Sequence, residues 1–286
     1  MLIKPDRHAI EVAVRMALLE DAPWGDLTSE ALLPSDMQVS AHLMAREEGV
    51  LCGEDVVSSA MYLTGPVTLQ FLKHDSDVFS AGDVLAVVSG PAHSILRAER
   101  VALNFVQRLS GIATLTAKYV AETVGTRARI VDTRKTTPGL RVLERYAVRC
   151  GGGRNHRFSL SDAVLAKDNH LAALRSSRIE DLTTGLRRAI AHLPHTTHVE
   201  VEVDEIDQIE PVLAAGVDTI MLDNFSIEDL RIGVRLIAGR ALVEASGGVS
   251  LEQVREIANT GVDLISVGAL THSVRSIDLG LDFVKP

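Results

Sequence analysis

The sequence has few cysteines and no long apolar run. Its 286 residues include two cysteines, Cys52 and Cys150, too few for a disulfide framework or a cysteine-rich metal cluster. The N-terminal residues carry Lys4, Asp6 and Arg7 and lack the apolar core of a signal peptide. No window approaches the roughly 18–20 apolar residues of a membrane span. These absences predict a cytoplasmic protein that binds no membrane.

Aromatic residues and basic residues are also scarce. Aromatics make up 3% of the chain, and 29 Lys and Arg stand against 38 Asp and Glu, for a formal net charge of -9. An acidic chain without a broad basic surface is not expected to bind nucleic acid. Hydrophobic residues nevertheless make up 46%, with a mean hydropathy of +0.16. These are mostly Ala, Val, Leu and Ile, which favours helices packed on β-branched strands.

The first part of the chain predicts a small α+β unit. Apolar residues at helical spacing predict a helix over residues 6–19. A second, long helix is predicted over residues 94–124, with an interruption near Ser110-Gly111. Short extended runs bounded by turn residues lie between these helices, at residues 39–45, 67–72 and 84–88.

After Gly125 the pattern changes to alternating strands and helices. Strands are predicted at residues 129–133, 163–166, 198–203, 219–222, 241–245 and 264–267. Helices are predicted between them at residues 138–149, 179–193, 206–215, 227–238 and 251–260. Such alternation is typical of a parallel sheet covered by helices.

Polar or glycine residues follow almost every one of these predicted strands. A barrel gathers all its strand ends at one mouth, where the site is built. A doubly wound sheet would concentrate the chemistry near a single switch point instead. The wide distribution of polar strand ends therefore favours the barrel.

Cationic residues are concentrated between Arg127 and Arg157, where nine Arg or Lys stand against two acids. Burying such charge without a counterion is costly, so a small polyanionic ligand is expected. Pairing with Asp132, Glu202, Asp204 and Asp223 is the alternative. Arg141, Arg145 and Arg149 are spaced four apart on a predicted helix and are expected at its surface. The cations that lie at or near strand ends are Arg134, Lys135, His156, Arg157 and Lys167.

Two glycine-bearing turns follow the last two strands, Ser246-Gly247-Gly248 and Gly268-Ala269-Leu270. Each leads into a helix, where free backbone N–H groups and the helix dipole can hold a phosphate. An ordinary turn that uses glycine for its backbone angles is the alternative.

Acidic residues occupy one face of the strand at 198–203. Glu200, Glu202 and Asp204 alternate with valines, and Asp223 ends the next strand. Carboxylates that face a phosphate ligand suggest Mg²⁺, a hard cation that prefers oxygen ligands. Stabilisation of a developing cation and salt bridges to Lys135 and Lys167 are the alternatives.

Several motifs in order resemble the quinolinate phosphoribosyltransferase family, a group of type II phosphoribosyltransferases. They are EDAPWGDLTS, DTRKTTPGLR, YAVRCGGGRNHR, KDNH, VEVEVD, LDNF, SGGV and VGALTHS. The resemblance implies an α/β protein with an N-terminal mixed α/β sandwich over residues 1–110. An incomplete, TIM-like α/β barrel over residues 111–274 would follow, with residues 275–286 packing back on the first domain. It also implies an obligate homodimer, or a higher oligomer built from it.

The resemblance implies roles for individual residues. Arg134, His156, Arg157 and Lys167 would hold the two carboxylates of quinolinate, and Arg100 would enter from the neighbouring subunit. Lys135, Glu202 and Asp223 would face the ribose and pyrophosphate of 5-phosphoribosyl 1-pyrophosphate (PRPP), with Mg²⁺ bound at one or both acids. The remaining residues of the PRPP and phosphate site would be Thr133, Ser246, Gly247, Gly248, Gly268, Ala269 and Leu270.

The implied activity transfers the phosphoribosyl group of PRPP to quinolinate with decarboxylation, giving nicotinate mononucleotide, pyrophosphate and CO₂ for NAD biosynthesis. A sister enzyme that acts on nicotinate is the nearest alternative, but one carboxylate needs fewer cations than two. A non-catalytic sensor of a phosphorylated metabolite is an alternative of another class. Candidates at each expected motif position favour the enzyme.

Overall fold

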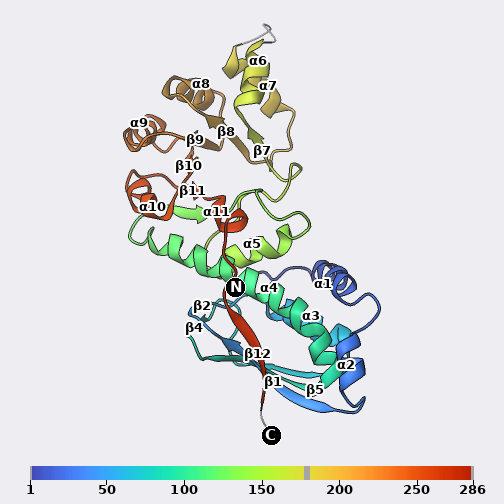
Figure 1. Cartoon of the computed structure of the whole chain (residues 1–286). Coiled ribbons are helices and arrows are strands. Elements are labelled where there is room, and N and C mark those ends of the chain that lie inside the picture. Colours follow the sequence, from blue (N-terminus) through green and yellow to red (C-terminus); the bar gives the residue numbers. More distant parts are fainter. Residues whose placement is uncertain (1, 177–180, 285–286) are drawn as a thin grey trace. The chain divides into compact units, whose positions relative to one another are not determined.

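The structure, a computed structural model, describes residues 2–176 and 181–284 (Figure 1). The chain divides into two compact units, and neither is continuous in sequence. Unit 1 comprises Met1–Ala117, Thr136–Gly152 and Ala269–Pro286, and unit 2 comprises Lys118–Lys135 and Gly153–Gly268. The polypeptide therefore passes repeatedly between the units, and each is described separately below.

Unit 1 contains a four-stranded antiparallel sheet in the order β12-β1-β5-β3. Its strands are β12 (Leu279–Phe283), β1 (Gln38–Ala45), β5 (Val84–Pro91) and β3 (Thr68–Phe71). Buried residues alternate along β1, where Ala41, Leu43 and Ala45 face the core. A separate two-stranded sheet pairs β2 (Gly49–Val50) with β4 (Val78–Phe79). The C-terminal segment therefore becomes an edge strand beside β1.

The first two helices of unit 1 begin where the sequence supplies capping groups. The Asp6 carboxylate accepts hydrogen bonds from the backbone N–H groups of His8 and Ala9, and Asp26 caps the next helix in the same way. These caps fix the start of each of the first two helices. The helices are α1 (Arg7–Asp21), α2 (Leu27–Leu32), α3 (Glu54–Thr64), α4 (Ala92–Ala121), α5 (Arg141–Cys150) and α11 (Ala269–His272).

The interruption predicted near Ser110-Gly111 is wrong, because α4 is continuous through both residues. Ser110 is buried, and its Oγ accepts a hydrogen bond from the Cys52 backbone N–H at 3.0 Å. A Cβ on Gly111 would lie 2.3 Å from the Arg275 carbonyl oxygen. Both small residues therefore serve close packing around α4 rather than ending the helix.

Unit 2 is built on a six-stranded parallel sheet in the order β6-β11-β10-β9-β8-β7. Each strand from β7 to β11 lies beside its neighbour in sequence, and the first strand, β6, pairs with the last, β11. This is the order of a barrel in which the β6–β7 pair is not formed, and it has no switch point. The predicted incomplete barrel is confirmed. The strands are β6 (Arg129–Val131), β7 (Val164–Ala166), β8 (Val199–Val203), β9 (Thr219–Asp223), β10 (Leu242–Ser246) and β11 (Leu264–Ser266).

The later helices of unit 2 alternate with these strands and pack against them (Figure 1). The helix predicted at 206–215 is divided, because a 3₁₀ turn, η1 (Ile206–Gln208), precedes α8 (Ile209–Ala214). The helix predicted at 179–193 corresponds to α7 (Leu182–Ala191), and its first two predicted residues lie outside the described residues. The other helices are α6 (Asp168–Ser176), α9 (Ile227–Ile237) and α10 (Leu251–Ala258).

The core of unit 2 lies between the sheet and these helices. Val201, Ile220, Leu222 and Ile265 have no exposed surface. Branched apolar side chains at alternate positions of neighbouring strands form this core, as the β-branched residues of the predicted strands indicate. In the part of the chain that is described, no helix combines the length and apolar character needed to span a membrane.

Candidate functional site

The predicted site residues of unit 2 lie at the carboxyl ends of its parallel strands. Arg134 and Lys135 follow β6, Lys167 follows β7, Asp223 ends β9, and Ser246 ends β10. Parallel register places Ser246 directly beside Asp223. The topology therefore gathers residues from distant parts of the sequence at one edge of the sheet.

Lys167 and Glu202 form an ion pair across β7 and β8. The Lys167 ammonium contacts the Glu202 carboxylate, while the Lys167 side chain stays 47% exposed. Glu202 lies in β8 and is buried. The pairing of a predicted ligand-binding cation with an acid was one alternative from the sequence, and the structure shows it for this pair. An incoming carboxylate would compete with Glu202 for the Lys167 ammonium.

Arg134 and Arg157 are near enough for the positive charge of one to affect the other. Burial lowers the pKa of Arg157, and the nearby positive charge of Arg134 lowers it further. The Arg157 side chain is oriented by a hydrogen bond from Nη1 to the Ala163 carbonyl oxygen, at 2.9 Å. Adjacent cations at a strand end provide the forked donors that a carboxylate or phosphate group would bind.

Asp132 orders the segment that carries His156. This carboxylate has no exposed surface and accepts hydrogen bonds from the His156 backbone N–H at 2.8 Å and from Asn155 Nδ2 at 2.6 Å. The Arg154 backbone adds a pair of hydrogen bonds with residues of β6 and its C-terminal end. Asp132 thus holds the Asn155-His156 turn against β6.

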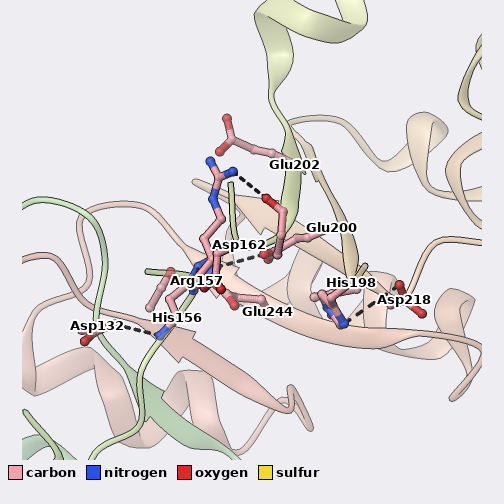
Figure 2. Close-up of polar contacts among 12 residues, drawn as sticks. Asp132, His156, Arg157, Asp162, His198, Glu200, Glu202, Asp218 and Glu244 are labelled. Atoms are coloured by element: carbon pink, nitrogen blue, oxygen red, sulfur yellow. Dashed lines mark hydrogen bonds and ion pairs between the residues drawn. The ribbon is translucent and has the colours of Figure 1, made fainter. Parts of the chain in front are cut away.

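His156 faces two buried glutamates inside unit 2 (Figure 2). Its Nε2 lies 2.9 Å from Glu200 Oε2 and 3.6 Å from Glu244 Oε1. Its Nδ1 accepts a hydrogen bond from the Arg157 backbone N–H at 2.8 Å, so the ring proton lies on Nε2 and is donated to Glu200. Both ring nitrogens are thus engaged within the protein. Direct contact of His156 with quinolinate, which stays a prediction, would require one of these bonds to break.

The charges around His156 change its pKa and that of Glu244. Burial by itself would lower the pKa of His156, but the hydrogen bond to Glu200 and the charges of both glutamates outweigh it, and the pKa is raised. Burial, and after it the neighbouring Glu200 charge, raise the pKa of Glu244 to about 8. Glu244 is therefore mostly protonated at neutral pH. A second proton on His156 can enter only at Nδ1, where it would displace the Arg157 N–H.

Glu244 was not among the residues predicted from the sequence, and Glu200 was predicted only as part of an acidic strand face. The signal for Glu244 is weak, because a single glutamate in the run LVEAS reads as an exposed strand residue. The pairing of β10 with β9 and β11 places it in the interior instead. Asp204, by contrast, lies beyond β8 and accepts a hydrogen bond from Gln208 Nε2 at 2.7 Å.

Two groups of three side chains bring potential metal ligands within 4.8 Å of one another among the described residues, and one is His156, Glu200 and Glu244. A metal would need the Nε2 lone pair, but the proton on Nε2 occupies it while Nδ1 accepts from the backbone. This arrangement of His156 therefore does not suit a metal. Glu202 and Asp223 offer carboxylate oxygens on neighbouring strands, the ligand type that Mg²⁺ prefers.

The turn after β10 approaches the backbone after β9 closely. The Asn224 N–H donates to the Ser246 carbonyl oxygen at 2.9 Å. Gly247 has a φ of +101°, and a Cβ there would lie 2.2 Å from Asn224 Oδ1. Glycine is therefore required at this position by both conformation and space. The Asn224 amide in turn donates to Asp223 Oδ2 at 2.6 Å, which links the predicted phosphate turn to a predicted acid.

The remaining predicted residues lie at the edges of this group or outside unit 2. Thr133 Oγ1 accepts a hydrogen bond from the Lys135 backbone N–H at 3.0 Å, which shapes the loop after β6. Gly268 follows β11, and Ala269 and Leu270 begin α11, which is assigned to unit 1. Arg100 is an exposed residue of α4 in unit 1. All of the predicted site residues except Arg100, Ala269 and Leu270 therefore belong to unit 2.

Comparison with known proteins accounts for both halves of the chain. Residues 26–110 match the model of the N-terminal domain of quinolinate phosphoribosyl transferase, and residues 112–282 match that of its C-terminal domain. The chain therefore belongs to the quinolinate phosphoribosyl transferase family.

Individual relatives agree with this assignment. A nicotinate-nucleotide pyrophosphorylase [carboxylating] from Mycobacterium leprae is 42% identical, over 99% of this chain and 100% of that protein. A probable enzyme of the same name from Bacillus subtilis is also 42% identical, over 92% of this chain and 90% of that one. The structure of the nicotinate-nucleotide pyrophosphorylase from Francisella tularensis superposes with a TM-score of 0.92 at 38% identity, covering 99% of each chain.

Proposed function

We propose that this chain is a carboxylating nicotinate-nucleotide pyrophosphorylase. It transfers the phosphoribosyl group of PRPP to quinolinate and releases pyrophosphate and CO₂, which gives nicotinate mononucleotide for NAD biosynthesis. The observation that carries the proposal is the family match through both halves of the chain, with the motif cations at the strand ends of one parallel sheet. The names of the relatives agree with it.

The substrate preference rests on the number of cations. Arg134, Arg157 and Lys167 supply two planar forks and one ammonium at or near strand ends of unit 2. Arg forks match carboxylate oxygens, whereas Lys acts as a point charge. Quinolinate carries two carboxylates, so this set suits it better than the single carboxylate of nicotinate. His156 contributes indirectly. Its Nδ1 accepts a hydrogen bond from the Arg157 backbone N–H, which fixes the backbone of Arg157.

The transfer step follows from the electrostatics of this edge. The pyridine nitrogen of quinolinate attacks C1 of the ribose while pyrophosphate leaves, and positive charge develops on the ribose ring. Glu202 and Asp223 would stabilise that charge with their carboxylates, and Lys135 would offset the charge of the leaving group. The bond from C2 of the ring to the carboxylate next to the ring nitrogen then breaks and CO₂ leaves. The electron pair stays on C2, stabilised by the ring cation, and C2 takes up a proton from solvent. Positioning and charge suffice, without a covalent enzyme intermediate.

We also propose that Mg²⁺ accompanies PRPP. Glu202 and Asp223 would hold it, because hard carboxylate oxygens on adjacent strands match a cation that also keeps waters and phosphate ligands. When bound, the ion would neutralise part of the pyrophosphate charge. The Glu202 carboxylate would first have to release Lys167, which it contacts here.

We further propose a homodimer in which Arg100 completes the site of the neighbouring subunit. Support comes from its position, because it is an exposed arginine of the AER motif on α4, outside the unit that carries the other cations.

A cytoplasmic location is also proposed. Support comes from the sequence, whose two cysteines are too few for a disulfide framework.

The proposal is tested by incubating the purified protein with Mg²⁺, PRPP and quinolinate, with nicotinate as a parallel substrate. Nicotinate mononucleotide and CO₂ are measured together. Product from quinolinate alone is expected, with one CO₂ released per nucleotide. Product from nicotinate alone would retain the transfer chemistry and overturn the substrate. PRPP binding without product from either substrate would favour the sensor.

A further inference from the structure

The only two cysteines of the chain meet in the interior of unit 1. Cys52 follows β2 and Cys150 ends α5, yet their sulfur atoms lie within 4.8 Å of each other. Cys52 has no exposed surface, and Cys150 retains 5%. Two thiols brought this close by folding can be joined by small side-chain rotations, provided that the backbone holds the residues at a suitable separation.

Backbone contacts hold both residues in place. The Cys52 N–H donates to Ser110 Oγ at 3.0 Å, and the Ser110 hydroxyl is 3.3 Å from the Cys52 carbonyl oxygen. The residue after Cys150, Gly151, caps α5 through its N–H, and a Cβ there would lie 2.3 Å from the Ala113 carbonyl oxygen. Both cysteines are thus packed against α4, which fixes their separation.

The two thiols are chemically different. The hydrogen bond from Cys52 lowers the pKa of Cys150, although burial opposes this effect. Burial raises the pKa of Cys52 well above its ordinary value, and its hydrogen bond to Cys150 adds to the rise. The thiolate is the reactive form of cysteine. Cys150, a buried residue with 5% of its surface exposed where Cys52 has none, is therefore the thiol expected to react first.

We propose that Cys52 and Cys150 form an oxidation site at which a hydroperoxide produces an intrachain disulfide. The Cys150 thiolate attacks the peroxide oxygen, the O–O bond breaks, and an alcohol or water leaves, so that Cys150 becomes a sulfenic acid. The Cys52 sulfur then attacks the Cys150 sulfur and expels water, while the Cys52 proton leaves with it. Two thiols are oxidised by two electrons, and one peroxide is reduced.

A metal site made of Cys52, Cys150 and Asp75 is the competing use of the same cluster. The Asp75 carboxylate already has a structural role at the start of α3. Its Oδ1 accepts from the backbone N–H groups of Gly53 and Glu54, at 2.7 and 3.2 Å, and its Oδ2 accepts from the Tyr146 hydroxyl at 2.8 Å. Its oxygens point at these donors, which leaves the thiol pair as the reactive part of the cluster.

The cross-link would act on a segment with a predicted role. Cys150 leads directly into Gly151-Gly152-Gly153, which connects α5 to the residues around His156. A disulfide would anchor the start of this glycine run to the segment after β2. The proposed oxidation involves only the two thiols, so the result of its test is independent of the proposed transferase activity.

The test treats the reduced, folded full-length protein with hydrogen peroxide and then counts thiols after denaturation. We expect both thiols to be lost together, with an intact mass lower by two hydrogen atoms. Proteolysis without reductant should yield one peptide pair joined through Cys52 and Cys150, which dithiothreitol separates. Thiols that survive in the folded protein at peroxide doses that oxidise the unfolded chain would overturn the proposal.

Single variants test the order of the two steps. In Cys52→Ser, we expect a sulfenic acid at Cys150 that dimedone traps, because no second thiol can resolve it. In Cys150→Ser, Cys52 is expected to remain a thiol under the same treatment. Dimedone labelling of Cys52 but not Cys150 would contradict the assigned roles. If a variant fails to fold, brief dimedone treatment of the wild-type protein during oxidation identifies the cysteine that reacts first.

Discussion

Glu244 is an ionisable residue whose side chain has no exposed surface. It lies in β10, where the residues directly before and after it in the sequence are apolar. Its pKa of about 8 is set first by burial and then by the charge of Glu200. The folded protein therefore holds this proton more tightly than the unfolded chain, in which the pKa of a glutamate is near 4.5. Stability must then fall as the pH rises from about 4.5 through 8. The pKa of His156 is raised as well, so the stability that this residue contributes is also lost as the pH rises above about 6.5.

Glu244→Gln is expected to stabilise the protein at high pH. The amide matches the protonated carboxyl in shape and cannot ionise, so the pH-dependent loss at this position disappears. Each pKa unit corresponds to about 1.4 kcal/mol, so the gain at pH 8–9 should be on the order of a few kcal/mol. Urea unfolding from pH 5 to 9 measures it, and the difference from wild type should shrink toward pH 5. Glu256→Gln, at an exposed position of α10, is the control and should show no such trend.

Arg134 carries the residue-scale prediction for substrate binding. Replacing Arg134 with Ala removes a forked donor to a carboxylate, and charged hydrogen bonds of this kind contribute about 1.5–3 kcal/mol. The KM for quinolinate should therefore rise roughly 10- to 100-fold. Steady-state kinetics with varied quinolinate measure it. Arg154→Ala, an exposed arginine of the neighbouring motif, should leave KM near wild type. Equal effects of both variants would contradict a specific role for Arg134.

At the scale of elements, an ion pair between a part-exposed arginine and a buried glutamate fixes α5 to α4 within unit 1. Arg108 Nε of α4 donates to Glu144 Oε1 of α5 at 2.9 Å, Arg108 Nη2 lies 2.7 Å from the same oxygen as part of the ion pair, and Glu144 has no exposed surface. Glu144 also accepts from the Thr137 N–H and hydroxyl, at 3.0 and 2.8 Å. Arg108 reaches the Thr271 carbonyl oxygen at 2.8 Å as well. One pair thereby orders two segments that adjoin predicted site residues in sequence.

Arg108→Met should be strongly destabilising, because it leaves the Glu144 carboxylate buried without its cation. Breaking such a pair costs about 3–5 kcal/mol. The double variant Arg108→Met with Glu144→Leu should recover part of this loss, since no unpaired charge remains. Denaturant unfolding measures both. Arg7→Met removes an exposed pair with Glu11 and is the matched control, with an expected cost below about 1 kcal/mol. A double variant no more stable than Arg108→Met would argue against a charge penalty.

At the scale of the whole molecule, the proposed shared site predicts complementation between inactive variants. Arg100→Ala and Lys167→Ala should each be nearly inactive, and mixing them with subunit exchange should restore part of the activity. One mixed dimer then contains one site with both wild-type residues, as two-fold symmetry requires. The assay is nicotinate mononucleotide formation before and after exchange.

The control mixes two variants whose residues belong to unit 2 of the same chain. Arg134→Ala mixed with Lys167→Ala should recover no activity, because every site in that mixture lacks one of them. Recovery in this control would mean that Arg134 and Lys167 of one chain do not serve the same site. No recovery with Arg100→Ala, after exchange has been verified by mass-tagged subunits, would place Arg100 in the site of its own subunit.

Much of unit 2 follows from local sequence pattern. Each predicted strand overlaps an observed one, since short apolar runs bounded by glycine and polar residues have few other ways to fold. Unit 1 is less predictable. The helix α3 and the pairing of β12 with β1 were not identified, because a short amphipathic run is ambiguous and strand pairing across the whole chain leaves no local signal.

The sequence by itself determined the fold class, the family motifs and the cations at the strand ends, because these depend on residue type and spacing along the chain. Only the tertiary structure decided which groups meet. It placed Glu244 and Glu200 against His156, paired Lys167 with Glu202, and brought Cys52 to Cys150. Burial and strand register set these contacts, and both depend on residues far away in the sequence. The protonation of Glu244 and the reactivity of Cys150 are consequences of folding.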